Sequence, residues 1–153
     1  MTEIALPQLT FKVTSPVFSE GEMIPVKYTC DGVNVNPPLH LEGIPEETVS
    51  LALIVEDPDA PKGNWVHWLV WNLTPTDEIV EDVVPGEEGW NDFHQIEYGG
   101  PCPPGGTHRY FFKVFALDHM LRLAPGSSKH ELMHAMVGHI LASGELMGRY
   151  ARK

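Results

Sequence analysis

Hydrophobic residues along the chain form several short runs that end at polar or proline-rich segments. The run at residues 50–55 (SLALIV) is continuously apolar, and residues 65–73 (WVHWLVWNL) and 110–117 (YFFKVFAL) are long and rich in aromatic and β-branched residues. Residues 9–14 alternate between apolar and polar positions. Runs of this kind are typical of strands buried on both faces, or of a sheet held between two layers.

One segment near the C-terminus has helical spacing. Ser128 and Glu131 form a capping-box pattern, which marks the start of a helix. Apolar residues then recur every three or four positions from Leu132 to Leu141, which predicts an amphipathic helix. Two glycines leave its end open, and residues 144–150 fit a short strand. The whole pattern predicts a mostly β domain with one or two short helices near the C-terminus.

Length, composition and charge narrow the class of protein. The 153 residues fit a single domain, 1–153, and 42% hydrophobic with 20% charged residues is typical of a globular chain. The 14 Pro and 14 Gly break the chain into short segments, which suits strands better than long helices. A formal net charge of −11 without any Lys/Arg run argues against nucleic acid and anionic membrane surfaces as partners.

The sequence predicts neither a membrane span nor a secretion signal. No stretch approaches the about 20 apolar residues of a membrane helix, so we expect no stable membrane insertion. The N-terminal residues lack a signal-peptide pattern, and the expected location is the cytoplasm, with reduced thiols. Whether the two cysteines, Cys30 and Cys102, form one bridge is left open by the sequence.

Residues 130–134 (HELMH) match the H-E-x-x-H signature of zinc proteases. In such enzymes the two histidines bind zinc from the interior of a helix, and a further ligand completes the site. Here the capping box needs Glu131, which puts His130 in the first helical turn, and no further ligand follows in register. We therefore interpret this segment as an ordinary helix start and predict no metal site.

Three polar clusters lie at the ends of the predicted strands. Residues 57–61 (DPDAP) form a rigid, proline-bordered turn directly after the first buried run. At a period of two, Trp65 and His67 share one face of the next strand, and His108 and Tyr110 share one face of the third. If these strands are neighbours, one pocket collects five side chains: Asp57, Trp65, His67, His108 and Tyr110.

The predicted pocket suits a small anionic ligand. Apolar walls with few polar groups are typical of small-ligand sites, and two imidazoles with an ordinary pKa of about 6.5 present N–H donors or partial positive charge to an anion. Asp57 would oppose a bare anion unless it is protonated or bonded to a histidine, and it would favour a zwitterion with an ammonium group. As the alternative function, Asp57, His67 and His108 also suit a metal-dependent or acid–base enzyme.

The same residues resemble a known family. Residues 57–61, 65–68 (WVHW), 99–104 (GGPCPP) and 108–110 (HRY) are similar in order and spacing to the phosphatidylethanolamine-binding proteins, in particular their bacterial and archaeal Raf kinase inhibitor-like branch. The resemblance covers nearly the whole chain. It implies a β-sandwich-like fold with a large antiparallel sheet, and a small pocket at one end of that sheet for phosphate-type groups, including phosphorylethanolamine.

The resemblance also assigns site residues, with no catalytic or metal-binding residue among them. The implied ligand-binding residues are Asp57, Asp59, Pro61, Trp65, His67, His108 and Tyr110. Arg109 belongs to the motif, but the strand alternation turns it to the other face, which indicates a structural role. Val66 stands where animal members carry histidine, and we expect a more open pocket because the C-terminal helix that closes it in animal members is missing. His94 stands where this branch has a small residue, either near the pocket or on the surface.

The combined prediction is a non-catalytic binding protein without a cofactor. Its partners would be a small phosphorylated or otherwise anionic ligand and a kinase or protease that it inhibits or regulates. The loop at residues 85–91 (PGEEGWN), with Trp90 in it, is the candidate contact surface for a protein target, or else an ordinary solvated loop. A homodimer also fits this branch.

Overall fold

Two antiparallel sheets form the fold of residues 9–153, the part of the chain that this computed structural model describes. The larger sheet has the strand order β6-β4-β3-β7-β8 and the smaller sheet the order β1-β2-β5. The larger sheet consists of β3 (Ser50–Asp57), β4 (Trp65–Leu73), β6 (Glu87–Glu88), β7 (His108–Leu117) and β8 (Ile140–Tyr150). The smaller sheet consists of β1 (Lys12–Thr14), β2 (Leu39–Glu42) and β5 (Glu78–Ile79).

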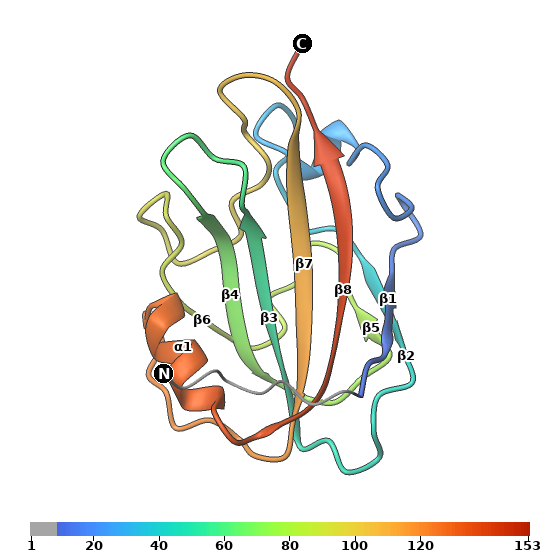
Figure 1. Ribbon diagram of the computed structural model, residues 1–153, viewed down its shortest axis with the longest axis vertical. Helices are drawn as coiled ribbons and strands as arrows, with labels where there is room; N and C mark the ends of the chain where they lie inside the picture. Colours follow the sequence, from blue (N-terminus) through green and yellow to red (C-terminus); the bar gives the residue numbers. More distant parts are fainter. Residues whose placement is uncertain (1–8) are drawn as a thin grey trace.

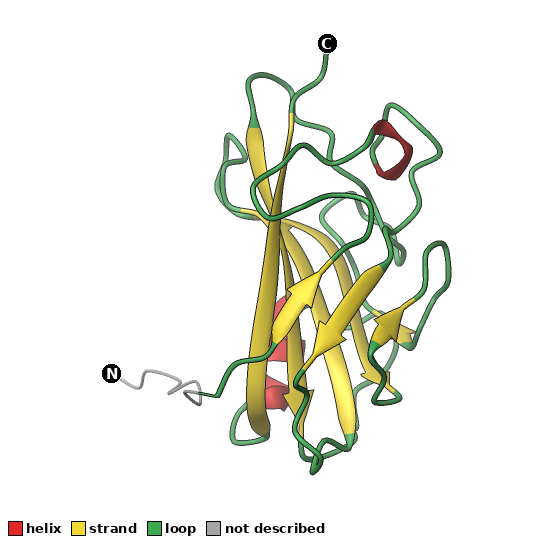
Figure 2. Ribbon diagram, turned by 90° about the vertical axis from the view of Figure 1, so that its right-hand side faces the viewer, coloured by secondary structure: helices red, strands yellow, loops and turns green. Residues whose placement is uncertain are grey.

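The larger sheet is the middle layer of the molecule (Figures 1 and 2). The helix α1 (Lys129–Met136) covers one of its faces, the smaller sheet covers the other, and the short 3-10 helix η1 (Val26–Tyr28) lies at one end. Alternate residues of β3 therefore enter two different cores, with Leu53 facing the smaller sheet and Ile54 facing α1. Every residue of β3 is buried, as the continuous apolar run predicts. The mostly β prediction is confirmed.

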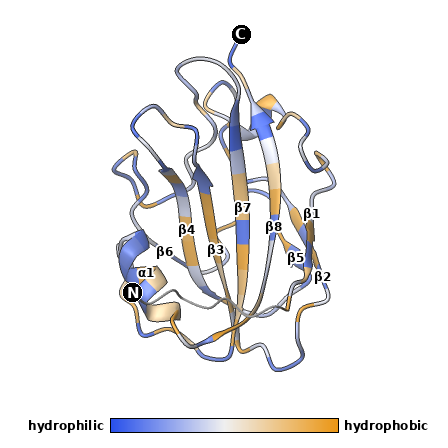
Figure 3. Ribbon diagram, viewed as in Figure 1, coloured by the Kyte–Doolittle hydropathy of each residue, from blue (hydrophilic) through white to orange (hydrophobic). Residues whose placement is uncertain are grey.

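The strand predictions differ from the structure mainly at their ends. β4 covers residues 65–73 as predicted, while β3 runs on to Asp57 and β7 already begins at His108, so both polar residues are strand ends. Figure 3 shows that β3 changes from hydrophobic to hydrophilic toward this polar end. The first strand is shorter than predicted, because β1 pairs with β2 only from Lys12 onward and Leu9 is exposed.

The predicted capping box starts α1. The Ser128 hydroxyl accepts the Glu131 N–H at 3.1 Å, and the Glu131 carboxylate accepts the Ser128 N–H at 2.9 Å. The helix ends at Met136, before the first of the two glycines that left its end open in the sequence: the chain turns at Gly138, where φ is 80°, and continues as β8. β8 is also longer than the short strand predicted for residues 144–150. Within residues 9–153, no helix is long and apolar enough to span a membrane.

Candidate functional site

The candidate site lies at one end of the larger sheet, where β3 ends and where β4 and β7 begin. Because β3 lies between β4 and β7, the three polar clusters of the sequence meet there. This is the end of the sheet that carries the C-terminus in Figure 1. A cavity of about 210 Å³ opens at this point. Six of the seven predicted ligand-binding residues line it: Asp57, Pro61, Trp65, His67, His108 and Tyr110.

Asp57 and His108 form a buried pair on the cavity wall. The His108 Nδ1 lies 2.7 Å from the Asp57 Oδ2, and the Asp57 Oδ1 accepts the Asp59 N–H at 2.7 Å. A carboxylate only accepts hydrogen bonds, so the His108 Nδ1 carries the proton and only its Nε2 is left for a ligand. Both Asp57 oxygens already have a donor, which offsets the repulsion that this carboxylate would exert on an anion.

His67 is held by the loop that follows residue 98. Its Nδ1 donates to the Gly99 carbonyl oxygen at 2.6 Å, which again leaves Nε2 for the cavity. The ring is 3% exposed, and this burial lowers its pKa, although the Gly99 carbonyl and the Asp57 charge act in the opposite direction. In the free protein at neutral pH, the His67 ring is therefore neutral and its Nε2 is a hydrogen-bond acceptor.

Two polar atoms in residues that line the cavity have no hydrogen-bond partner among the described residues. They are the Trp65 Nε1 and the Tyr110 hydroxyl, and both atoms are buried. The Cys102 main chain is near the Tyr110 hydroxyl, but it makes no hydrogen bond of normal geometry with it. An unpaired buried donor costs about 1–3 kcal/mol, so each of these atoms favours a ligand that can accept its hydrogen bond.

Asp59 is the predicted site residue that the structure leaves outside the cavity lining. Its carboxylate binds the Arg109 guanidinium in a two-pronged pair at 2.8 and 2.9 Å. These hydrogen bonds lower the pKa of Asp59 to about 2. Asp59 therefore braces the turn against β7 from the outer face, in agreement with the structural role expected for Arg109.

Phe93 is a cavity residue that the sequence did not reveal; its ring packs edge-on against the rings of Trp65 and His67, with centroid distances of 5.4 and 5.2 Å. An Asn91 turn positions it, since the Asn91 Oδ1 accepts the Phe93 N–H at 2.9 Å. The neighbouring His94, which the sequence left either near the pocket or on the surface, is exposed and does not line the cavity. The only feature of the sequence that pointed to this part of the cavity wall was the turn-forming Asn–Asp pair that precedes Phe93.

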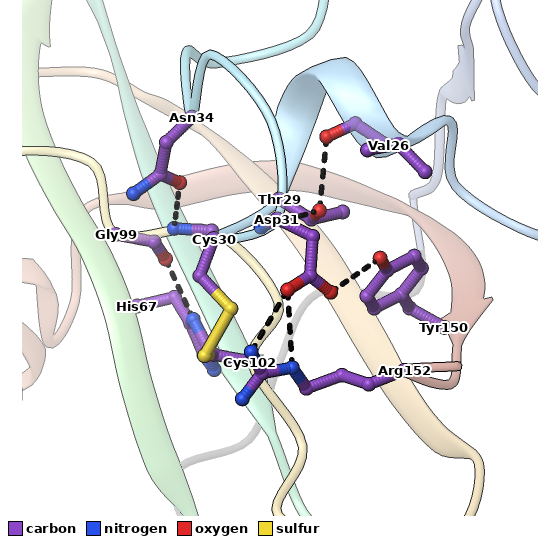
Figure 4. The surroundings of a disulfide bond; sticks show 11 residues. Val26, Thr29, Cys30, Asp31, Asn34, His67, Gly99, Cys102, Tyr150 and Arg152 are labelled. Atoms are coloured by element: carbon purple, nitrogen blue, oxygen red, sulfur yellow. Dashed lines mark hydrogen bonds and ion pairs between the residues drawn. A yellow bond between two sulfur atoms is a disulfide. The ribbon is translucent and has the colours of Figure 1, made fainter.

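The cysteines are joined by a disulfide between Cys30 and Cys102 (Figure 4). The expectation of reduced thiols is therefore wrong for this structure. Cys102 also lines the cavity together with Pro103 and Pro104, so the glycine- and proline-rich segment forms part of the cavity wall.

Two other features from the sequence lie away from the cavity. The segment at residues 85–91 is only partly a loop, because β6 within it pairs with β4, and the Trp90 side chain is 49% exposed. In the described part of the chain, no three His, Cys, Asp or Glu side chains are grouped so that they could hold a metal ion, and this includes the H-E-x-x-H segment.

The fold and the cavity together define a β-sandwich protein with a small ligand-sized cavity at the end of its central sheet. A profile of the family described as phosphatidylethanolamine-binding protein matches residues 14–151. A UPF0098 protein of Pyrococcus abyssi is 51% identical over 150 residues, which covers 91% of this chain and 84% of the relative. The chain belongs to the phosphatidylethanolamine-binding protein family.

Solved structures agree with this assignment. CT736 of Chlamydia trachomatis, which is described as a putative phosphatidylethanolamine-binding protein homolog, has a TM-score of 0.90 at 44% identity, over 94% of this chain and 99% of that chain. Escherichia coli YbcL has a TM-score of 0.86 at 32% identity, with the same coverage of 94% and 99%. YbcL is described as a new member of the mammalian phosphatidylethanolamine-binding protein family.

Proposed function

We propose that this protein is a non-catalytic binding protein whose cavity holds the phosphate group of a small ligand. The observation that carries the proposal is that two residues of the cavity lining, Trp65 and Tyr110, each hold a buried polar atom, the Nε1 and the hydroxyl, without a partner among the described residues. A small shift of these two side chains would bring both atoms into contact with phosphate oxygens, and the His108 Nε2 is left for a third contact. A volume of about 210 Å³ suits a phosphate group better than a large organic molecule.

The contacts of Asp57 favour recognition of phosphate over recognition of an amine. Both of its oxygens are already bonded, so a ligand ammonium would have to share or displace an existing donor. We therefore expect inorganic phosphate and phosphorylethanolamine to bind with affinities that agree within about threefold, and ethanolamine not to bind. Calorimetric titration of the three compounds tests the proposal, which fails if neither phosphate compound binds or if ethanolamine alone does.

Removing the Tyr110 hydroxyl should weaken phosphate binding without weakening the fold. A hydrogen bond to a charged ligand is worth about 1.5–3 kcal/mol, so the Tyr110→Phe variant should bind phosphate at least about tenfold more weakly. Its unfolding free energy should stay equal or rise slightly, because the hydroxyl lacks a partner in the free protein. Tyr150→Phe is the matched control, since the Tyr150 hydroxyl bonds Asp31 and not the cavity. An unchanged affinity in Tyr110→Phe would contradict the proposed contact.

Anion binding should tighten as the pH falls from about 8 to about 6. Burial lowers the pKa of His67, so the free protein holds a neutral ring, and an anion beside its Nε2 favours protonation. Binding therefore takes up a proton, and its affinity rises on acidification. Sulfate carries no proton in this range, so its affinity should increase by about tenfold with no contribution from ligand titration.

Two variants separate His67 from other histidines in this pH test. His67→Gln should flatten the dependence of sulfate affinity on pH, whereas His130→Gln, at an exposed position on α1, should leave it intact. A sulfate affinity that stays constant or falls with acidification would show that His67 takes up no proton on binding.

Several predictions from the sequence remain open beside this proposal. The inhibitory role toward a kinase or protease, the homodimer and the cytoplasmic location all remain predictions. The Asp57–His108 pair is the observation that favours the enzymatic alternative, because a carboxylate that orients an imidazole is a common acid–base arrangement. Slow hydrolysis of a phosphate monoester that is lost in His108→Ala would support that alternative.

A further inference from the structure

The disulfide between Cys30 and Cys102 lies in the wall of the candidate cavity. Cys102 lines the cavity, and the bond connects it to a segment 72 residues earlier in the sequence (Figure 4). We propose that this disulfide is a reversible redox switch: its reduction loosens the cavity wall after Cys102 and weakens anion binding. The inference rests on the proposed function, because it concerns the regulation of the same cavity.

Hydrogen bonds hold the two disulfide-bearing segments together independently of the sulfur atoms. The Cys30 N–H donates to the Pro101 carbonyl oxygen at 3.1 Å, and the Gly100 N–H donates to the Asn34 Oδ1 at 2.8 Å. The Tyr98 hydroxyl donates to a main-chain carbonyl of the same early segment at 2.7 Å. A Cβ at Gly100 would collide with main-chain atoms of that segment, which shows how closely they pack. The segments should therefore stay in contact after reduction, with the two thiols near enough to reoxidise.

The wall beyond Cys102 has much weaker anchoring. In the described chain, no hydrogen bond joins residues 103–107 to the rest of the protein. Pro103 and Pro104 line the cavity but have no N–H, and a Cβ added at either of the next two glycines would meet nothing within 4 Å. The disulfide is thus the last fixed point before β7 begins at His108. Once it opens, Pro103 and Pro104 gain conformational freedom. Binding of a ligand then loses free energy, because the two prolines must be ordered again.

The redox step balances with a dithiol as reductant. One thiolate of the dithiol attacks a sulfur of the Cys30–Cys102 bond and forms a mixed disulfide while the other cysteine leaves as a thiolate. The second thiol of the reductant then displaces the remaining cysteine. Two electrons and two protons pass to the protein, which ends with two thiols, and the reductant becomes a disulfide.

The first test compares phosphate affinity in the oxidised protein, in the protein reduced with dithiothreitol, and in Cys30→Ser. This variant removes the bond but replaces none of the residues that line the cavity, because Cys102 is kept. Reduced wild type and Cys30→Ser should bind phosphate about tenfold more weakly than the oxidised protein. Reoxidation should restore the affinity of wild type, and dithiothreitol should not affect Cys30→Ser.

A second measurement follows the alkylation of the reduced protein by iodoacetamide. Phosphate should slow the reaction of Cys102 several-fold and leave that of Cys30 unchanged, because only Cys102 lines the cavity. Equal phosphate affinity in both redox states would overturn the switch while the proposed function stands. Loss of the folded circular dichroism spectrum on reduction would also overturn it, since a switch must stay folded. Absence of binding in both states would overturn the switch and the proposed function together.

Discussion

Removing the disulfide should lower the free energy of unfolding more than any of the side-chain substitutions proposed above. The Cys30–Cys102 bond closes a loop of 72 residues, and restricting so long a loop in the unfolded chain stabilises the folded state by about 4 kcal/mol. A variant with both cysteines replaced by serine should lose about this much unfolding free energy in urea denaturation. For a chain of this size the midpoint of thermal unfolding should fall by roughly 10 °C.

The reduced wild-type protein is the control for this stability loss. It should unfold at the same urea concentration as the double-serine variant, because both lack the same constraint. A loss below about 1 kcal/mol would mean that the unfolded chain gains little freedom when the bond opens. Extrapolated to zero urea, the same unfolding curves also show whether the reduced protein is folded under the conditions of the binding experiments.

Acidification should destabilise the protein between about pH 4.5 and pH 2 through one buried carboxylate, Glu56. Glu56 is 5% exposed on the α1 side of β3 and binds Lys113 at 2.6 Å, Lys129 at 2.5 Å and Asn64 at 2.8 Å. Burial alone would raise its pKa, but the three donors outweigh burial and lower the pKa to about 2. The folded-state pKa lies below that of the unfolded chain, so the stabilisation is complete above the ordinary value of 4.5 and is lost as the pH falls toward 2.

The Glu56→Gln variant measures the size of this contribution. At neutral pH it should be less stable than wild type by roughly 3 kcal/mol, and the difference should shrink toward zero as the pH approaches about 2. Glu46→Gln, in an exposed turn, is the matched control and should track wild type at every pH. A Glu56→Gln difference that stays constant with pH would show that packing, and not the charge of Glu56, is responsible.

The central strands could be predicted from the sequence because their burial leaves a strong pattern. Residues 65–73 are apolar on both faces and end where the strand ends, so β4 is predicted in full. The end of α1 could not be predicted, because the apolar spacing that suggests a helix up to Leu141 also fits a strand. Pairing of Ile140 with Leu117 on β7 decides the outcome in favour of β8, and this contact is invisible in local sequence.

The candidate site was predictable where it lies on strands and less so where it lies on loops. A period of two correctly puts Trp65 with His67 and His108 with Tyr110 on the cavity side. Asp59 follows the same motif, but its carboxylate pairs with Arg109 outside the cavity. The cavity walls formed by loop residues depend on how each loop packs against the strands. Such packing leaves no periodic pattern in the sequence.

The measurement that tests the central claim most directly is a phosphate titration followed through the histidine ring signals in NMR spectra. The claim is that a phosphate group binds between Trp65, Tyr110 and the two cavity histidines. We expect saturable shifts of the His67 and His108 signals with one common dissociation constant, while the exposed His130 stays unchanged. Saturation of phosphate binding without movement of the His67 and His108 signals would place the ligand elsewhere and contradict the claim.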